Sequence, residues 1–154
     1  MSVISTAYDQ MISRLGTLLP VTSATYQRLS NPYDLESNAS TLLDQGWGLA
    51  IGPGSNSNRQ LCSLVTTLRT MTVVLTRTAD AGENDDSTRD GVVKALLEDA
   101  RSVVNDFERN VRLDTTDTNC RFISDGGVES FGGSEGSMYY AIRLTFEAEI
   151  FDAP

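Results

Sequence analysis

Acidic side chains that lie close together in the sequence are the first candidates for chemistry. Glu147 and Glu149 are two residues apart, so on a strand they would share one face, as a general acid and base pair can. The stretches 80–86 and 114–119 carry oxygen ligands of the kind that Ca²⁺ prefers, without the ligand spacing of a helix–loop–helix calcium site. Outward-facing acids and solvated acidic loops are common, so these residues predict neither catalysis nor a bound metal.

The other residues that could carry out chemistry give equally weak evidence of a site. The chain has no histidine, which removes imidazole bases and zinc sites with a histidine ligand. Cys62 and Cys120 therefore lack a histidine partner for nucleophilic catalysis, and both are expected to be buried free thiols. The glycines of 46–52 lack the spacing and the lysine of a phosphate-binding loop. The sequence predicts no enzyme, no metal and no cofactor.

Length and charge narrow the class of protein further. The chain has 154 residues, which favours a single domain over 1–154. It carries 12 Lys and Arg against 21 Asp and Glu, a formal net charge of −9, which argues against binding nucleic acid by neutralising phosphates. We see no signal peptide and no apolar run long enough to cross a membrane, so we expect a protein made in a reducing cytoplasm.

A helical period predicts two helices. Apolar residues recur at steps of three and four between Ser5 and Leu19, and Pro20 is expected to end this helix. A second helix is predicted to begin with a capping box at 87–90 and to run to about Asn110. Its apolar stripe is expected to face the core and consists of Val92, Val93, Leu96, Leu97, Ala100, Val103, Val104 and Phe107.

β-Branched residues and alternating polarity predict the strands. The predicted strands lie at 46–52, 61–78, 120–124 and 138–150. Residues 26–29 could start a further short strand, which the pattern does not decide. Polar or glycine-rich composition predicts loops at 53–58, 79–86 and 125–136. The order helix–strands–helix–strands indicates an α+β fold, a mixed or antiparallel sheet with two main helices packed on one face.

This layout resembles the tail terminator, or tail-completion, proteins from the neck of tailed bacteriophages. The resemblance covers nearly the whole chain and consists of an N-terminal helix, a glycine-punctuated strand at Trp47–Gly52 and a long Thr/Val strand. An amphipathic helix at Asp90–Arg109 follows, and a closing strand at 138–150 alternates aromatic and apolar residues. The match is one of layout and size, without a diagnostic motif.

The resemblance implies a virion structural protein with no catalysis and no cofactor, assembled in the host cytoplasm. Its copies would form a hexameric ring on the last tail-tube ring, stop tube polymerisation and meet the head-connector protein. Genomic DNA would pass through the lumen without specific binding, which the acidic balance permits. The candidate interface residues are Arg143, Glu147 and Glu149 on the polar face of the last strand, with Trp47 and Tyr139 as aromatic anchors or core filler.

Two alternatives stay open from the sequence. The chain could be another head–tail connector component, an adaptor or stopper. Such a protein would also belong to the virion but would lie at a different level of the neck. It could also be a small cytoplasmic enzyme or ligand-binding domain, against which the missing histidine, metal spacing and phosphate loop all count. The neighbouring genes would separate these classes, because a terminator gene usually stands just before the tail-tube gene.

Overall fold

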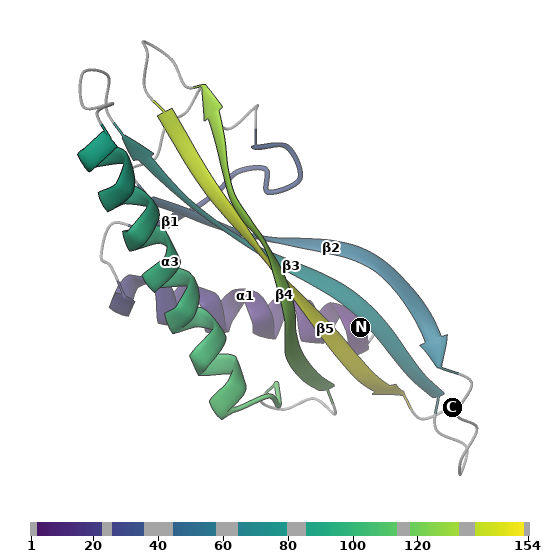
Figure 1. Cartoon of the computed structure of the whole chain (residues 1–154). Coiled ribbons are helices and arrows are strands. Elements are labelled where there is room, and N and C mark those ends of the chain that lie inside the picture. The colour runs from purple at the N-terminus through teal and green to yellow at the C-terminus, as the bar shows by residue number, and fades with distance from the viewer. Residues whose placement is uncertain are drawn as a thin grey trace.

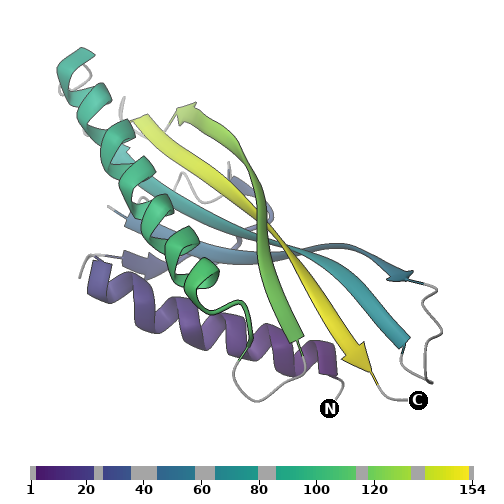
Figure 2. The ribbon, with the colours of Figure 1, turned by 60° about the horizontal axis from the view of Figure 1, so that its bottom comes forward.

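The fold is a single five-stranded sheet with two long helices on one of its faces (Figures 1 and 2). The structure is a computed structural model, and it describes residues 3–22, 26–35, 45–57, 65–79, 86–113, 118–132 and 138–152. The elements are α1 (Val3–Thr22), β1 (Tyr26–Arg28), β2 (Gln45–Ser57), β3 (Val65–Ala79), α3 (Asp86–Arg109), β4 (Thr118–Gly132) and β5 (Met138–Asp152).

The strand order across the sheet is β1-β2-β3-β5-β4. The short strand β1 runs parallel to β2, and every other neighbouring pair is antiparallel. The central pair, β3 and β5, stays in register from Val65 opposite Asp152 to Ala79 opposite Met138. The predicted α+β class, with a mixed sheet and both helices on one face, is confirmed.

The main core lies between the helices and the sheet. Alternate residues of the strands point towards the helices, because successive side chains on a strand face opposite ways. On β5 this buried set is Tyr140, Ile142, Leu144, Phe146, Ala148 and Ile150. The helices meet it with buried side chains at Ala7, Met11, Leu15 and Leu19 of α1 and at Leu96, Ala100, Val103 and Phe107 of α3.

A second, smaller core covers part of the opposite face of the sheet. The chain after β1 crosses this face, and Leu29 and Leu35 pack there against Val74, Tyr139 and Ala141. The sequence patterns did not predict this layer, because a short turn segment with scattered apolar residues has no measurable period.

The backbone of β2 and the turn after β1 approach each other very closely. A Cβ placed on Gly48 would lie 2.6 Å from the Cβ of Pro32. The absence of a side chain at residue 48 is therefore what lets the turn lie against the strand.

The two helices differ from the predictions at their ends. α1 continues past Pro20 to Thr22, because a proline near the last turn removes one helical hydrogen bond without forcing the chain out of the helix. α3 begins at Asp86, so Ser87, the first residue of the predicted capping box, lies inside the first turn.

The predicted apolar stripe of α3 is wrong at Leu97. That side chain is 46% exposed, whereas the neighbouring Leu96 is fully buried. Each helical residue turns the direction of its side chain by about 100°, so the stripe that contains Ala100, Val103 and Phe107 includes Leu96 and leaves Leu97 outside.

Two predicted loops are largely strand. β2 continues through 53–57, with a register shift between Ile51 and Gly54. β4 continues through 125–132, with register shifts between Phe122 and Ser124 and again at 125–128. Glycine- and proline-rich composition favours loops, but β-bulges also absorb such residues while the strand goes on. The predicted strand start at 61–64 and the predicted loops at 80–85 and 133–136 lie outside the described residues.

Candidate functional site

The most buried polar cluster joins three elements of the fold. The Tyr26 hydroxyl of β1 donates to Asp99 Oδ2 of α3 at 2.5 Å, and Arg77 of β3 reaches the same oxygen from Nε at 2.9 Å and from Nη2 at 2.7 Å. Burial raises the pKa of Tyr26 well above its usual value, and the hydrogen bond to the Asp99 carboxylate adds to the rise. The tyrosine therefore stays protonated and holds elements together instead of moving protons.

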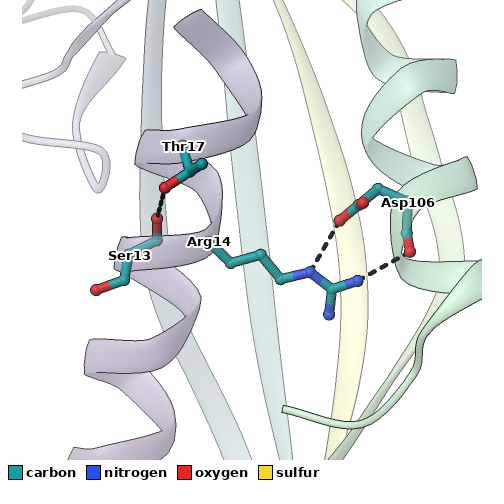
Figure 3. A network of polar contacts seen from close by, with 4 residues as sticks. All are labelled: Ser13, Arg14, Thr17 and Asp106. Atoms are coloured by element: carbon teal, nitrogen blue, oxygen red, sulfur yellow. Dashed lines mark hydrogen bonds and ion pairs between the residues drawn. The ribbon is translucent and has the colours of Figure 1, made fainter. Parts of the chain in front are cut away.

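A second polar cluster fastens α1 to the end of α3 (Figure 3). Arg14 Nε meets Asp106 Oδ2 at 2.8 Å, and Arg14 Nη2 donates to the backbone carbonyl of Asp106 at 2.8 Å. The guanidinium carbon also lies 4.0 Å from the centre of the Phe107 ring, a favourable cation–π contact. Nε and Nη2 of Arg14 are thus committed to contacts within the chain, whereas the buried Nη1 has no hydrogen-bond partner in the structure.

The cysteine that the structure describes is not a nucleophile. Cys120 is a buried free thiol, as predicted, and burial raises its pKa to about 12. At neutral pH it is therefore held as the unreactive thiol. Cys62, the other predicted buried thiol, lies outside the described residues.

The part of the chain that the structure describes contains neither a cluster of metal ligands nor a membrane-spanning helix. No group of three or more His, Cys, Asp or Glu side chains within it is placed to hold a metal ion. Most of the acidic stretches 80–86 and 114–119 lies outside it. Neither of its helices is long and apolar enough to cross a membrane.

The predicted interface residues fall into two groups. Trp47 and Tyr139 are buried, 5% and 0% exposed, and therefore offer no surface to a partner. Trp47 shares the helix-facing side of β2 with Leu49, whereas Tyr139 lies on the opposite face, beneath Leu29 and Leu35. The alternation of β5 places Tyr139 on the polar face, and only the unforeseen second core explains its burial.

The charged candidates lie on the polar face of β5. Arg143 is half-buried and forms an ion pair with Glu129 on the neighbouring strand β4. Glu147 is exposed, and its partners in the sheet register are Thr70 on β3 and Arg121 on β4. Their role in an interface stays a prediction.

The free edge of β2 carries a partly apolar hollow. β1 pairs only with 45–47, so the rest of β2 has no strand on its outer side within the described residues. A hollow of about 430 Å³ opens there, lined by Ile4, Ser5, Tyr8, Asp9, Tyr33 and Ile51. The Ile51 N–H donates to the Tyr33 hydroxyl at 3.1 Å, and the tyrosine is nevertheless 65% exposed.

The opposite edge of the sheet, β4, carries an exposed apolar residue. Its first residues, 118–120, are held by 111–113 through backbone hydrogen bonds such as Cys120 N–H to the Val111 carbonyl at 2.6 Å. Beyond that point no described strand covers the edge. Ile123 lies there at the first register shift and is 56% exposed, and the nearby Arg121 is also exposed.

Sequence reasoning missed both Tyr33 and Ile123 as surface residues. Tyr33 belonged to a predicted turn and Ile123 to a predicted short strand. Neither pattern says that the strand will be at an edge, because edge position depends on pairing between segments far apart in the chain.

Comparison with known proteins finds similarity among solved structures. No protein-family model matches the chain, and no curated protein sequence matches it. Among solved structures, the chain is similar to one in the "Virion of native gene transfer agent (GTA) particle". That match has a TM-score of 0.44 and 14% sequence identity, and covers 94% of this chain and 91% of the other.

Proposed function

We propose that this chain is a structural protein of a tailed-phage-like virion, and within it the tail terminator. One observation carries the proposal. The buried carboxylate of Asp99 and the half-buried guanidinium of Arg77 hold the fold together, while Tyr33 stands exposed beside the free part of β2 and Ile123 on the free part of β4. Exposed apolar residues beside polar ones mark protein–protein contacts more often than catalytic sites.

In this role the protein works through geometry. Copies contact one another head to tail and close into a ring, since a heterologous interface ends growth only when its rotation closes. The ring lies on the last ring of the tail tube and presents to the head connector a surface to which tube subunits do not add. The net charge of −9 leaves DNA free to pass, because an acidic lumen does not hold phosphates.

The alternative of a small ligand-binding domain has less support. A second hollow, of about 440 Å³, lies between α1 and 110–113 and includes Arg14 in its lining. Nε and Nη2 of that guanidinium already donate to the side chain and the backbone of Asp106, which leaves only Nη1 for an anion. An adaptor or stopper would use the same exposed edges and differs in its place in the neck.

Particles in which this chain is absent test the proposal. Without a terminator, tube polymerisation should continue, so tails should be longer than normal and should not join to heads. Electron microscopy of the products measures both effects. Tails of normal length that fail only at joining would instead favour the adaptor or stopper role, and normal joined particles would overturn the virion role.

A further inference from the structure

We propose that Asp125 is a site of spontaneous isomerisation to isoaspartate, with water as the only other reactant. The backbone nitrogen of Gly126 attacks the carboxyl carbon of Asp125, and its proton leaves with the carboxyl hydroxyl as water, which closes a five-membered succinimide ring. Water then opens the ring at the main-chain carbonyl of Asp125, so that the chain continues through its side chain. This inference is independent of the role proposed for the chain in a virion.

The sequence contains two places where this reaction is favourable. An aspartate followed by glycine is the favourable pair, because glycine has no side chain to obstruct the attacking nitrogen. The two pairs are Asp90–Gly91 in α3 and Asp125–Gly126 in β4. The same two residue types therefore stand in two different backbone environments.

The pair in β4 lies in a β-bulge at an open edge of the sheet. The register of β4 with β5 shifts between Asp125 and Val128 and gives Gly126 and Gly127 no opposite residue. Gly127 has a positive φ of 78°, which glycine adopts without strain. A bulge leaves its extra residue out of the ladder, and no described strand covers the outer side of β4 here. Regular strand pairing therefore does not hold the Gly126 backbone.

The carboxyl group of Asp125 already lies beside the peptide that would attack it. Asp125 Oδ1 accepts the Gly127 N–H at 2.9 Å. In such an Asx turn the side chain curls over the residue between donor and acceptor, which here is Gly126. The hydrogen bond thus keeps the carboxyl group on the side of the chain from which the ring closes.

Space and solvent are available at the same point. Asp125 and Gly126 are both exposed. A Cβ placed on Gly126 would meet no atom within 4 Å. The ring can therefore form without displacing a neighbour, and water can reach the ring to open it.

The helix protects the other pair. Asp90 and Gly91 are also exposed, so exposure does not distinguish the two pairs. Within an α-helix, however, each N–H donates to the carbonyl four residues earlier and the backbone dihedral angles are fixed. Ring closure has to rotate the backbone between the aspartate and the glycine, so α3 must first open locally.

The modification would alter the polar face of the sheet. Isoaspartate adds one methylene to the main chain at the bulge, four residues before Glu129. Glu129 is the ion-pair partner of Arg143 on β5. Modification of Asp125 therefore changes the spacing on which this ion pair depends.

Tryptic peptides of the aged protein test the inference. Trypsin cuts after arginine and lysine, so peptides 122–143 and 90–94 contain a single aspartate each, Asp125 and Asp90. The folded chain is kept at physiological temperature and neutral pH, and mass spectrometry with electron-transfer dissociation measures isoaspartate in both peptides over time. We expect it to form at least about tenfold faster at Asp125, because α3 must open before Asp90 can react. In urea, which removes the fold, the two rates should be similar.

Gly126→Ala is the matched variant. The added Cβ obstructs the attack on the carboxyl carbon and meets no neighbour, so thermal unfolding should match the unaltered chain. Peptide 122–143 of this variant should lose nearly all of its isoaspartate, while peptide 90–94 should be unchanged. The inference is overturned by similar rates at the two aspartates in the folded chain, by the absence of isoaspartate from the folded chain, or by an undiminished rate in Gly126→Ala.

Discussion

The guanidinium of Arg14 spans both the carboxylate and the backbone carbonyl of Asp106, 92 residues further along the chain. The Asp106 carbonyl also accepts the Asn110 N–H at 3.2 Å, so the arginine is its second donor, and the same guanidinium packs on the Phe107 ring. One side chain thereby fixes α1 against the last turns of α3, and the helix layer that supports the sheet depends on it.

Removing this arginine should weaken the fold. Arg14→Ala loses the two hydrogen bonds and the ring contact, and we expect about 2 kcal/mol less free energy of unfolding. Asp106→Asn keeps the backbone acceptor and is partly solvent-screened, so it should cost about 1 kcal/mol or less. Urea unfolding measures both, with Arg101→Ala, an exposed arginine of the same helix, as the control. Equal small losses at Arg14 and Arg101 would show that the cluster does not stabilise the fold.

Two adjacent leucines of α3 test which face of this helix is buried. Leu96→Ala should cost about 2–5 kcal/mol because the side chain is fully buried. Leu97→Ala should change the unfolding free energy by less than about 0.5 kcal/mol, since that side chain is largely in solvent. Chemical denaturation of the two variants side by side checks the orientation of the helix, and reversed values would mean that the helix is rotated.

Gly48 should not tolerate a side chain. A Cβ there would overlap Pro32, whose backbone is part of the same tight turn, so Gly48→Ala should destabilise the protein by about 1–3 kcal/mol. Gly126→Ala is the matched control, because no atom lies within 4 Å of its added Cβ. Thermal unfolding of both variants compares them, and an unaffected Gly48→Ala would contradict the packing of the turn on β2.

Stability should fall in alkaline solution, partly through Cys120. Its folded pKa is raised from 9.0 to about 12, so the unfolded chain loses its proton first as the pH rises. The stabilising effect is full below pH 9 and declines above it, by about 1.4 kcal/mol per pH unit for this one group. Tyr26, whose pKa is also raised by burial, adds to the decline at still higher pH.

The variant Cys120→Ala isolates that contribution. Its unfolding free energy should fall less steeply between pH 9 and 11 than that of the unaltered chain, whatever the fixed cost of the smaller side chain. Urea unfolding over this pH range measures the slopes. Parallel slopes would mean that Cys120 ionises equally in the folded and unfolded chain.

The sequence predicts where helices and strands lie better than it predicts which of their side chains are buried and where the strands end. The period of α3 and the alternation of β5 identify both elements, because each buries one continuous face. The predicted stripe includes Leu97 because it is too wide: of the two adjacent leucines, only Leu96 is in line with Ala100, Val103 and Phe107. The strand extensions at 53–57 and 125–132 are missed because glycine-rich bulges and loops have the same composition.

The candidate surface is harder to predict than the fold. The alternation of β5 places Tyr139 on the polar face and leaves open whether it is an interface anchor or core filler; it is buried by Leu29 and Leu35, two residues more than 100 positions away in the sequence. Tyr33 and Ile123 become candidates only when the strand order puts β4 at one edge and the short β1 leaves most of β2 uncovered at the other. Such relationships arise from long-range pairing, for which a single sequence carries no local signal.

The place of the chain in assembled particles tests the central claim most directly. Electron cryomicroscopy of intact particles, with the chain located by its long helix α3 against the five-stranded sheet, gives both its position and its copy number. We predict one closed ring, of six copies as the resemblance to tail terminators implies, at the junction of tail tube and head connector. Copies repeated along the tail, or no copies in the particle, would contradict the account.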